Sequence, residues 1–410
     1  MRPSKPVLLS HNWRFINLWL GETVSTLGAS LGTLALTWFI YEATHSKTAM
    51  GGIWLSYLLP SLLVQMLSGP YLDRWNRQQV LVFSQLSRAV LFGLLSLLAI
   101  GSHLEPWLFY LVSCLNGTIQ ALYSPSSMAA LPQVVPLEQR TAGNSYLDGT
   151  TRLMMFLGPM IGGLLLAAIG VKQTLIIVVV AYGLSALCLS RLGLTSSPKN
   201  PLQDSWWQQL KSGYQYYFQQ SVLVFLSVWI ASIQFAVGVT MVINLPYITD
   251  ELGGSSFMYG LFIGGYPFGY FIGTVLLARI KVGIGKITML SAFSLGGVSF
   301  IALSINHDLL VAILIEALAG LTAPFFHVGS TNLFQRLVPN DLRGRVFSVR
   351  LFVVRSTMPL GVLAGGSLAE LWGTRQLFGM IGGIILLMGI VGLILPMNLT
   401  HSDHSPDHSL

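Results

Sequence analysis

Long apolar runs alternate with short polar segments along the whole chain. A helix that crosses a bilayer needs about 20 mostly apolar residues, and only helices or closed barrels satisfy their backbone hydrogen bonds in lipid. Runs as long and continuous as these indicate helices. Their approximate bounds are 13–41, 49–68, 79–101, 106–131, 141–169, 172–193, 221–248, 256–279, 284–305, 308–335, 344–371 and 375–396. The pattern therefore predicts an all-α membrane protein with twelve transmembrane helices.

Composition and charge agree with a membrane protein. Of the 410 residues, 53% are hydrophobic and only 9% are charged, whereas soluble domains carry about 25% charged residues. Fifteen of the 22 Lys and Arg residues fall in alternate loops that begin with the N-terminal segment, and three fall in the opposite loops. By the positive-inside rule, this bias predicts a multi-pass protein of the cell (inner or plasma) membrane with both termini in the cytoplasm. It also explains the net charge of +7 without a nucleic-acid partner.

The segment that begins at Val135 recurs from Val338, at a constant offset of 203 residues. The eight identical pairs include one arginine inside each membrane span, Arg152 and Arg355. Because an even number of spans separates the copies, we expect two pseudo-symmetric six-helix bundles in parallel orientation. The predicted parts are an N-terminal half (1–194), a cytoplasmic linker with an interfacial helix (195–220), a C-terminal half (221–396) and a cytoplasmic tail (397–410).

The segment between the second and third runs gathers charge in an otherwise apolar chain. The stretch SGPYLDRWNRQQV holds Gly69, Asp73, Arg74 and Arg77. This G-x-x-x-D-R-x-x-R pattern resembles the signature of the major facilitator superfamily, although Gln78 stands where that family often has Arg or Lys. Glycine permits close helix approach, and an aspartate can cap a neighbouring helix N-terminus. We expect a gating motif between the halves; the alternative is a set of charges that only fixes topology.

A second stretch, FLGPMIGG, contains Gly158, Pro159, Gly162 and Gly163. It resembles the Gly-Pro motif in the fifth span of drug antiporters, where small residues allow close packing and a bend between the halves. The segments after the fourth and tenth spans look like those of the branch that holds the enterobactin exporter and macrolide-efflux proteins. The resemblance covers about residues 13–396. It implies a transporter in which spans one, four, seven and ten line a central cavity.

Ionisable side chains inside spans cost about 2.5–3.5 kcal/mol each and are candidate functional groups. The acids are Glu22, Asp148 and Glu316. The resemblance places Glu22 and Glu316 on cavity-lining spans, and burial favours the neutral form of a carboxyl group, as proton exchange near neutral pH requires. Glu22 is the first candidate for proton coupling. Its alternative is a polar residue bonded to a neighbouring helix.

The arginines inside the spans have different local surroundings. Asp148 and Arg152 stand one turn apart in the order that favours an intrahelical ion pair, which either neutralises both charges or binds substrate. Leu351 occupies the corresponding position before Arg355, so we expect Arg355 to pair with another helix or with an anionic substrate. Arg88 is expected to extend toward the cytoplasm.

These features favour a secondary active transporter that exports a small amphipathic compound, such as a drug or macrolide, in exchange for protons. No G-x-x-x-x-G-K-[ST] run is present in the sequence to bind ATP phosphates, and no metalloprotease motif or Ser-His-Asp set indicates an enzyme. We expect no cofactor and no metal; the His-rich tail reads as a solvated disordered segment. The expected partners are the substrate, protons and the bilayer, with a monomer as the functional unit. Siderophore export and lipid or lysolipid flipping are the alternatives.

Overall fold

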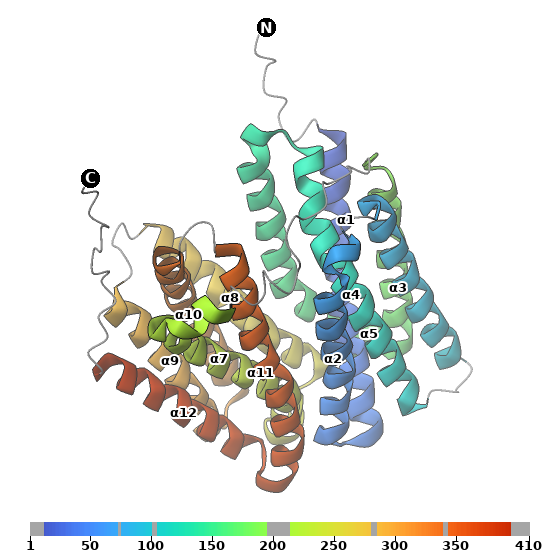
Figure 1. The fold of residues 1–410 in the computed structure, drawn as a ribbon. Coiled ribbons are helices and arrows are strands. Elements are labelled where there is room, and N and C mark those ends of the chain that lie inside the picture. Colours follow the sequence, from blue (N-terminus) through green and yellow to red (C-terminus); the bar gives the residue numbers. More distant parts are fainter. Residues whose placement is uncertain are drawn as a thin grey trace, which may run out of the picture.

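The computed structural model describes residues 12–72, 75–100, 105–194, 214–279, 285–338 and 343–394. Within these ranges every regular element is a helix (Figure 1). In chain order they are α1 (Trp13–Thr44), α2 (Lys47–Leu72), α3 (Arg77–Ile100), α4 (Pro106–Val134), η2 (Leu137–Gln139), α5 (Arg140–Ser190), α7 (Ser221–Pro246), η3 (Tyr247–Glu251), α8 (Ser256–Arg279), α9 (Lys286–Ile305), α10 (Leu309–Leu337), α11 (Arg343–Trp372) and α12 (Thr374–Ile394).

Nine stretches of the described residues are long and apolar enough to cross a membrane. One of them, Ala142–Ser190, has 49 residues, about twice the length that one crossing needs. It covers most of the predicted runs 141–169 and 172–193, which are separated at Gly170, where φ is 77° and the backbone is not helical. Helices α2 and α4, with 26 and 29 residues, are not among the nine. The prediction of an all-α membrane protein is confirmed.

Local side chains and glycines set where several helices begin and end. The Asn12 side chain accepts a hydrogen bond from the Phe15 N–H at the start of α1, and Asp308 does the same for Val311 at the start of α10. Such caps satisfy N–H groups that lack a partner within the helix. Gly373 separates α11 from α12 with a φ of 93°, a conformation that glycine adopts without steric cost.

The helices pack in pairs that recur along the chain. In the first group, α1 packs on α5, α2 on α4, and α3 on α5; in the second group, α7 packs on α11, α8 on α10, and α9 on α12. Figure 1 shows α1–α5 on one side and α7–α12 on the other. Helices α5 and α8, and α2 and α11, pack across the boundary. We call α1–α5 the first helix group and α7–α12 the second.

One end of the assembly carries short connections, at His45–Ser46, Leu252–Ser255 and Gly373. We call it the turn end, and the opposite end, where α1 and α7 begin, the starting end. Interactions between the two groups hold the turn end together. The Tyr41 hydroxyl on α1 donates a hydrogen bond to the Asp250 carboxylate in η3. Across the other seam, Glu370 of α11 accepts hydrogen bonds from Ser46 Oγ (2.7 Å) and Thr48 N (3.1 Å) at the start of α2.

The repeat found in the sequence has a counterpart in these contacts. Ser256 Oγ, at the start of α8, donates to the Gly163 carbonyl of α5 at 3.1 Å. Thr48 Oγ1, at the start of α2, donates to the Gly366 carbonyl of α11 at 3.3 Å. Gly163 and Gly366 are repeat partners, so the two seams are built from equivalent positions.

Part of the predicted linker is described. Residues 195–213 and the tail 397–410 lie outside the described residues, whereas residues 214–219 are helical. The sequence predicts an interfacial helix in this linker. Tyr214 is exposed, but Tyr217 is buried, and its hydroxyl donates to Ser227 Oγ of α7. Tyr216 donates to the Leu337 carbonyl of α10 at 3.1 Å. The described part of the linker is thus docked on the second helix group.

Candidate functional site

A cavity of about 970 Å³ lies between the two helix groups. Most of its wall is apolar or aromatic, including Tyr259, Tyr266 and Tyr270 of α8. The first group contributes uncharged side chains, namely Thr26, Ala29, Ser30, Thr33, Leu34, Thr37, Trp54, Met154, Met155 and Pro159. The ionisable lining residues other than tyrosine are Glu316, His327, Arg350 and Arg355. A pocket of this size and chemistry suits a small amphipathic molecule.

Close packing of α8 on α10 sets the wall around Glu316. A Cβ atom at Gly269 would lie 1.8 Å from the Ala317 carbonyl oxygen, and one at Gly320 would lie 2.0 Å from the Tyr266 carbonyl oxygen. Neither position has room for a side chain, so the two backbones touch. Within the described ranges, Glu316 forms no ion pair with a Lys or Arg side chain. A carboxyl group without a counter-charge in an apolar wall can take a proton or a cationic group of a substrate.

Arg355 of α11 reaches across the boundary. Its Nη1 donates to Gln65 Oε1 of α2 at 3.2 Å, and the same side chain lines the cavity. The structure therefore gives Arg355 a partner on another helix, as the sequence predicts. Because that partner is a neutral amide, the guanidinium keeps its charge available to an anionic group.

Arg350 was not among the candidates derived from the sequence. It is buried in the cavity wall, with its Cζ 4.6 Å from the centroid of the Phe334 ring, and its Nη1 has no hydrogen-bond partner among the described residues. Its position in a span, one and a half turns before Arg355, was the available signal. His327 of α10 lines the cavity as well.

Asp148 and Arg152 form the intrahelical ion pair expected from their spacing. Arg152 Nε lies 2.9 Å from Asp148 Oδ2, and the two side chains are 37% and 65% exposed, respectively. The Arg152 Cζ also lies 5.0 Å from the centroid of the Tyr270 ring on α8. Neither charged residue is among those that line the cavity. The pair sits at the α5–α8 seam, beside the cavity.

Glu22 differs from the sequence expectation. It does not line the cavity, although Thr26, one turn further along α1, does. Its Oε1 accepts hydrogen bonds from the Tyr123 hydroxyl (2.7 Å) and from Ser127 Oγ of α4. The prediction of a cavity-lining Glu22 is wrong because these hydroxyls hold the carboxylate inside the first helix group. The hydrogen-bonded alternative fits the structure.

Arg88 lies in the same interior region. It is 1% exposed, so its guanidinium does not extend to the cytoplasm as the sequence suggests. The Cζ lies 5.2 Å from the Tyr123 ring centroid and 5.5 Å from that of Tyr182, and Nη2 donates to Gln120 Oε1. A buried arginine and a half-buried glutamate thus share Tyr123.

The Gly-Pro stretch of α5 faces two helices. A Cβ atom at Gly158 would lie 2.5 Å from Ser30 Oγ, and one at Gly162 would lie 2.8 Å from Leu34 Cδ2, both on α1. At Gly163 it would lie 2.3 Å from the Ser256 carbonyl oxygen on α8. The stretch therefore joins the two helix groups through backbone contact.

Pro159 takes part in the same seam. It lines the cavity, and its carbonyl oxygen would lie 2.3 Å from a Cβ atom at Gly260 of α8. About one turn before Pro159, the Phe156 ring of α5 stacks on the Phe268 ring of α8, with the ring centroids 4.9 Å apart.

The charged signature is only partly described. Gly69 lies near the end of α2, and Asp73 and Arg74 lie outside the described residues. Arg77 Nη1 donates to the Ala129 carbonyl of α4 at 2.9 Å, a contact within the first helix group.

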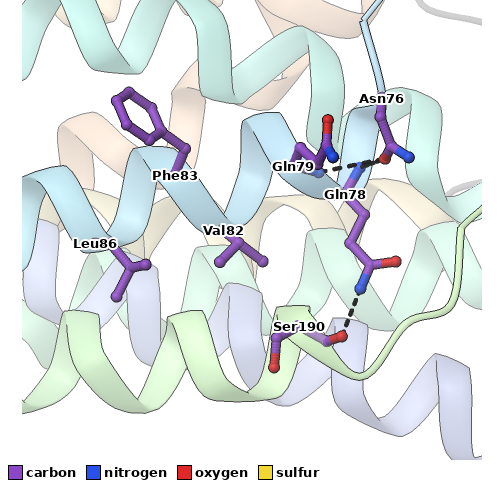
Figure 2. A pocket seen from close by; sticks show the side chains of 7 residues that line it. All are labelled: Asn76, Gln78, Gln79, Val82, Phe83, Leu86 and Ser190. Carbon is purple, nitrogen blue, oxygen red and sulfur yellow. Dashed lines mark hydrogen bonds between the residues drawn. The ribbon is translucent and has the colours of Figure 1, made fainter.

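Gln78, the departure from the family signature, has a structural role. Its Nε2 donates to the Ser190 carbonyl and its Oε1 accepts from the Leu194 N–H at 2.8 Å. An arginine or lysine there could donate but could not accept. Figure 2 shows Gln78 beside a second pocket, of about 520 Å³, on the outer face of α3. That pocket is mainly apolar, with Phe83 71% exposed, as expected for a lipid-facing surface.

The sequence matches a known protein family and known transporters over nearly its whole length. A family model for transmembrane secretion effectors matches residues 9–409. Macrolide efflux protein A of Streptococcus pyogenes is 22% identical over 389 residues, covering 93% of this chain and 96% of that protein. The staphyloferrin A transporter of Staphylococcus aureus is 23% identical over 388 residues, covering 92% and 96%.

A solved structure shares the fold. A bacterial homologue of the iron transporter ferroportin in an inward-facing state superposes with a TM-score of 0.73 at 20% identity, covering 94% of this chain and 98% of that one. At this identity the likeness concerns the fold alone.

Proposed function

Because the chain belongs to the transmembrane secretion effector family of the major facilitator superfamily, we propose that it is a secondary active transporter that exports a small amphipathic compound in exchange for protons. The observation that carries the proposal is the cavity of about 970 Å³ between the two helix groups, apolar over most of its wall and with few charged groups. The macrolide and siderophore transporters that resemble the chain over nearly their whole length support export.

We propose that the spans number twelve and form two six-helix bundles. Taking α5 as two spans joined at Gly170, and adding α2 and α4, extends the nine apolar stretches to this number. The recurring helix pairs and the equivalent contacts of Gly163 and Gly366 support a first half ending near residue 194 and a second beginning near residue 221. The charge bias of the loops supports placing the starting end in the cytoplasm of a cell-membrane protein. We propose a monomer as the functional unit.

Chemistry along α10 suggests how a substrate would bind. Glu316 and His327 are eleven residues apart on α10, or about 16 Å at about 1.5 Å per residue. Arg350 and Arg355 of α11 lie in the same wall. The cavity thus has an acidic group in a wall that includes aromatic rings, and a separate basic region. An amphipathic amine would place its charged group at Glu316 and its apolar body against the tyrosines of α8.

Transport by reconstituted protein tests the proposal. Proteoliposomes with an imposed pH gradient are expected to move a labelled macrolide against its gradient, and dissipating the pH gradient is expected to stop this movement. Glu316→Gln should reduce macrolide binding, whereas Glu42→Gln, which changes an exposed carboxylate of α1 outside the cavity wall, should not. Macrolide movement that is insensitive to the pH gradient would contradict proton coupling.

A siderophore is the second candidate substrate. Arg350 and Arg355 in the cavity wall, together with the likeness to the staphyloferrin A transporter, favour this alternative. A labelled carboxylate siderophore in the same assay, with Arg355→Gln as the variant, distinguishes the two: an anionic substrate loses affinity in Arg355→Gln and a macrolide in Glu316→Gln. Counterflow of labelled lysolipid tests the flippase alternative.

A further inference from the structure

We propose that Glu22, Tyr123 and Arg88 form one proton-binding unit inside the first helix group. Arg88 is the positioning residue of this unit, since its positive charge stabilises the ionised form of Glu22. The unit is separate from the substrate cavity. The inference rests on the proposed proton coupling and names the residues that would perform it. Glu22 would bind the proton; Arg88 would act on it through space and through the ring and hydroxyl of Tyr123.

The geometry joins the two charged side chains through one tyrosine. The Tyr123 hydroxyl donates to Glu22 Oε1 at 2.7 Å, while the Arg88 Cζ lies 5.2 Å from the centroid of the same ring. From these two distances and the size of a phenol ring, the guanidinium and carboxylate are about 8 Å apart, a range at which one charge still acts on another through protein. Arg88 forms no ion pair within the described residues, so Glu22 is the acid it faces.

The surroundings contain few other groups that titrate. Tyr57 of α2, Tyr123 of α4 and Tyr182 of α5 face Arg88. The remaining polar neighbours are neutral: Ser127 Oγ donates to Glu22, and Gln120 accepts from Arg88. Glu22 is therefore the carboxyl group of this cluster and the candidate for reversible protonation, since tyrosine and arginine titrate at far higher pH.

The unit is adjacent to the cavity but does not open into its wall. Thr26 Oγ1 donates to the Glu22 carbonyl at 2.8 Å, and Thr26 lines the cavity whereas Glu22 does not. Protonation of Glu22 would thus weaken its charge interaction with Arg88 and the hydrogen bonds that link α1 to α4. Proton binding would alter helix packing in the first group without competing for the atoms that hold the substrate at Glu316.

Infrared titration of the purified protein tests this inference without any substrate. The carbonyl-stretch band of a protonated carboxyl, assigned to Glu22 by its loss in Glu22→Gln, gives the midpoint of protonation. In Arg88→Gln the loss of a positive charge at roughly 8 Å, with an effective dielectric constant of about 20, should move that midpoint upward by about 1.5 pH units. Arg88→Lys should remain close to the original protein because it keeps the charge.

Two tyrosine variants are matched controls. Tyr123→Phe removes a hydrogen bond to the charged carboxylate and should also move the midpoint upward. Tyr182→Phe should not move it, because its ring packs on Arg88 but its hydroxyl has no hydrogen-bond partner among the described residues. These variants keep the rings, so they remain informative if Arg88→Gln does not fold.

The outcomes separate the two proposals. A midpoint unchanged in both Arg88→Gln and Tyr123→Phe, or moved equally in Tyr182→Phe, overturns the role of Arg88 even if Glu22 still titrates. Absence of any band that Glu22→Gln removes overturns Glu22 as the proton carrier, and proton coupling would then depend on Glu316 or Asp148.

Discussion

Gly163→Ala should selectively weaken the contact between the two helix groups near the turn end. A Cβ atom at Gly163 would lie 2.3 Å from the Ser256 carbonyl oxygen and 3.1 Å from Phe257 Cα, whereas ordinary contact begins at 3.4 Å. Both obstacles are backbone atoms that cannot rotate away, so α8 must move back by about 1 Å. Overpacking of this kind costs about 1–3 kcal/mol. If this cost falls only on the conformation that is closed at the turn end, the conformation that is open there gains about 5- to 150-fold in relative population.

Gly366→Ala is the matched control. Gly366 is the repeat partner of Gly163 and faces the start of α2, but a Cβ atom there would lie 3.4 Å from Thr48 Cα. The substitution and its position in the repeat are the same, and only the clearance differs. We expect less than a twofold population change, since ordinary contact adds no overpacking cost.

Cysteine labelling measures the population. Thr37 lines the cavity and is 1% exposed in this conformation. In a background with Cys114 and Cys188 changed to serine, Thr37→Cys would be labelled by a membrane-impermeant maleimide, applied from the turn end, only when that end opens. Gly163→Ala should raise the labelling rate by about 5- to 150-fold. An unchanged rate, or an equal rise in Gly366→Ala, would refute the reasoning.

Three further changes test other parts of the transporter. Glu370→Ala removes the α11 side chain that caps the start of α2. This loss should cost about 0.5–2 kcal/mol and raise the labelling rate of Thr37→Cys by about 2- to 30-fold. Glu370→Gln should have a smaller effect, and an unchanged rate in both variants would exclude the cap as a contact that closes the turn end. Arg355→Ala should lower transport more than Arg152→Ala, because Arg355 is in the cavity wall whereas Arg152 is paired with Asp148 outside it. The reverse order in transport and melting temperature would contradict this ranking. Asp73→Asn should slow transport while leaving expression and substrate binding intact, and unchanged turnover would exclude a gating role for the signature.

Several structural features could be read from the sequence because they depend on length or on local spacing. The apolar runs predicted the helices, the four-residue interval predicted the Asp148–Arg152 pair, and the absence of an acid at Leu351 predicted that Arg355 finds its partner elsewhere. The repeat at Val135 and Val338 predicted equivalent packing in the two groups. Each of these inferences needs only the chain itself or one helix turn.

The direction in which a side chain points around its helix could not be predicted in the same way. A helix that is apolar on all faces has no stripe that distinguishes the cavity from lipid or from a neighbouring helix. The sequence therefore neither excludes Glu22 from the cavity wall nor places Arg350 in it. Only the three-dimensional structure shows that Tyr123 and Ser127 draw Glu22 away from the cavity.

The two repeat arginines show how one scaffold can hold two different chemistries. Arg152 has Asp148 one turn before it and sits outside the cavity wall, bound in an ion pair. Arg355 has Leu351 there, pairs among the described residues with a neutral amide across the boundary, and lines the cavity. The two acids also differ in their surroundings. Glu22 of the first group is hydrogen-bonded to hydroxyls of α4, whereas Glu316 of the second group lines the cavity. Under the proposed function, a proton bound in the first group would act on a substrate held by the second through seam contacts such as those at Gly163 and Gly366, because backbone contacts across the boundary must change when the groups rock.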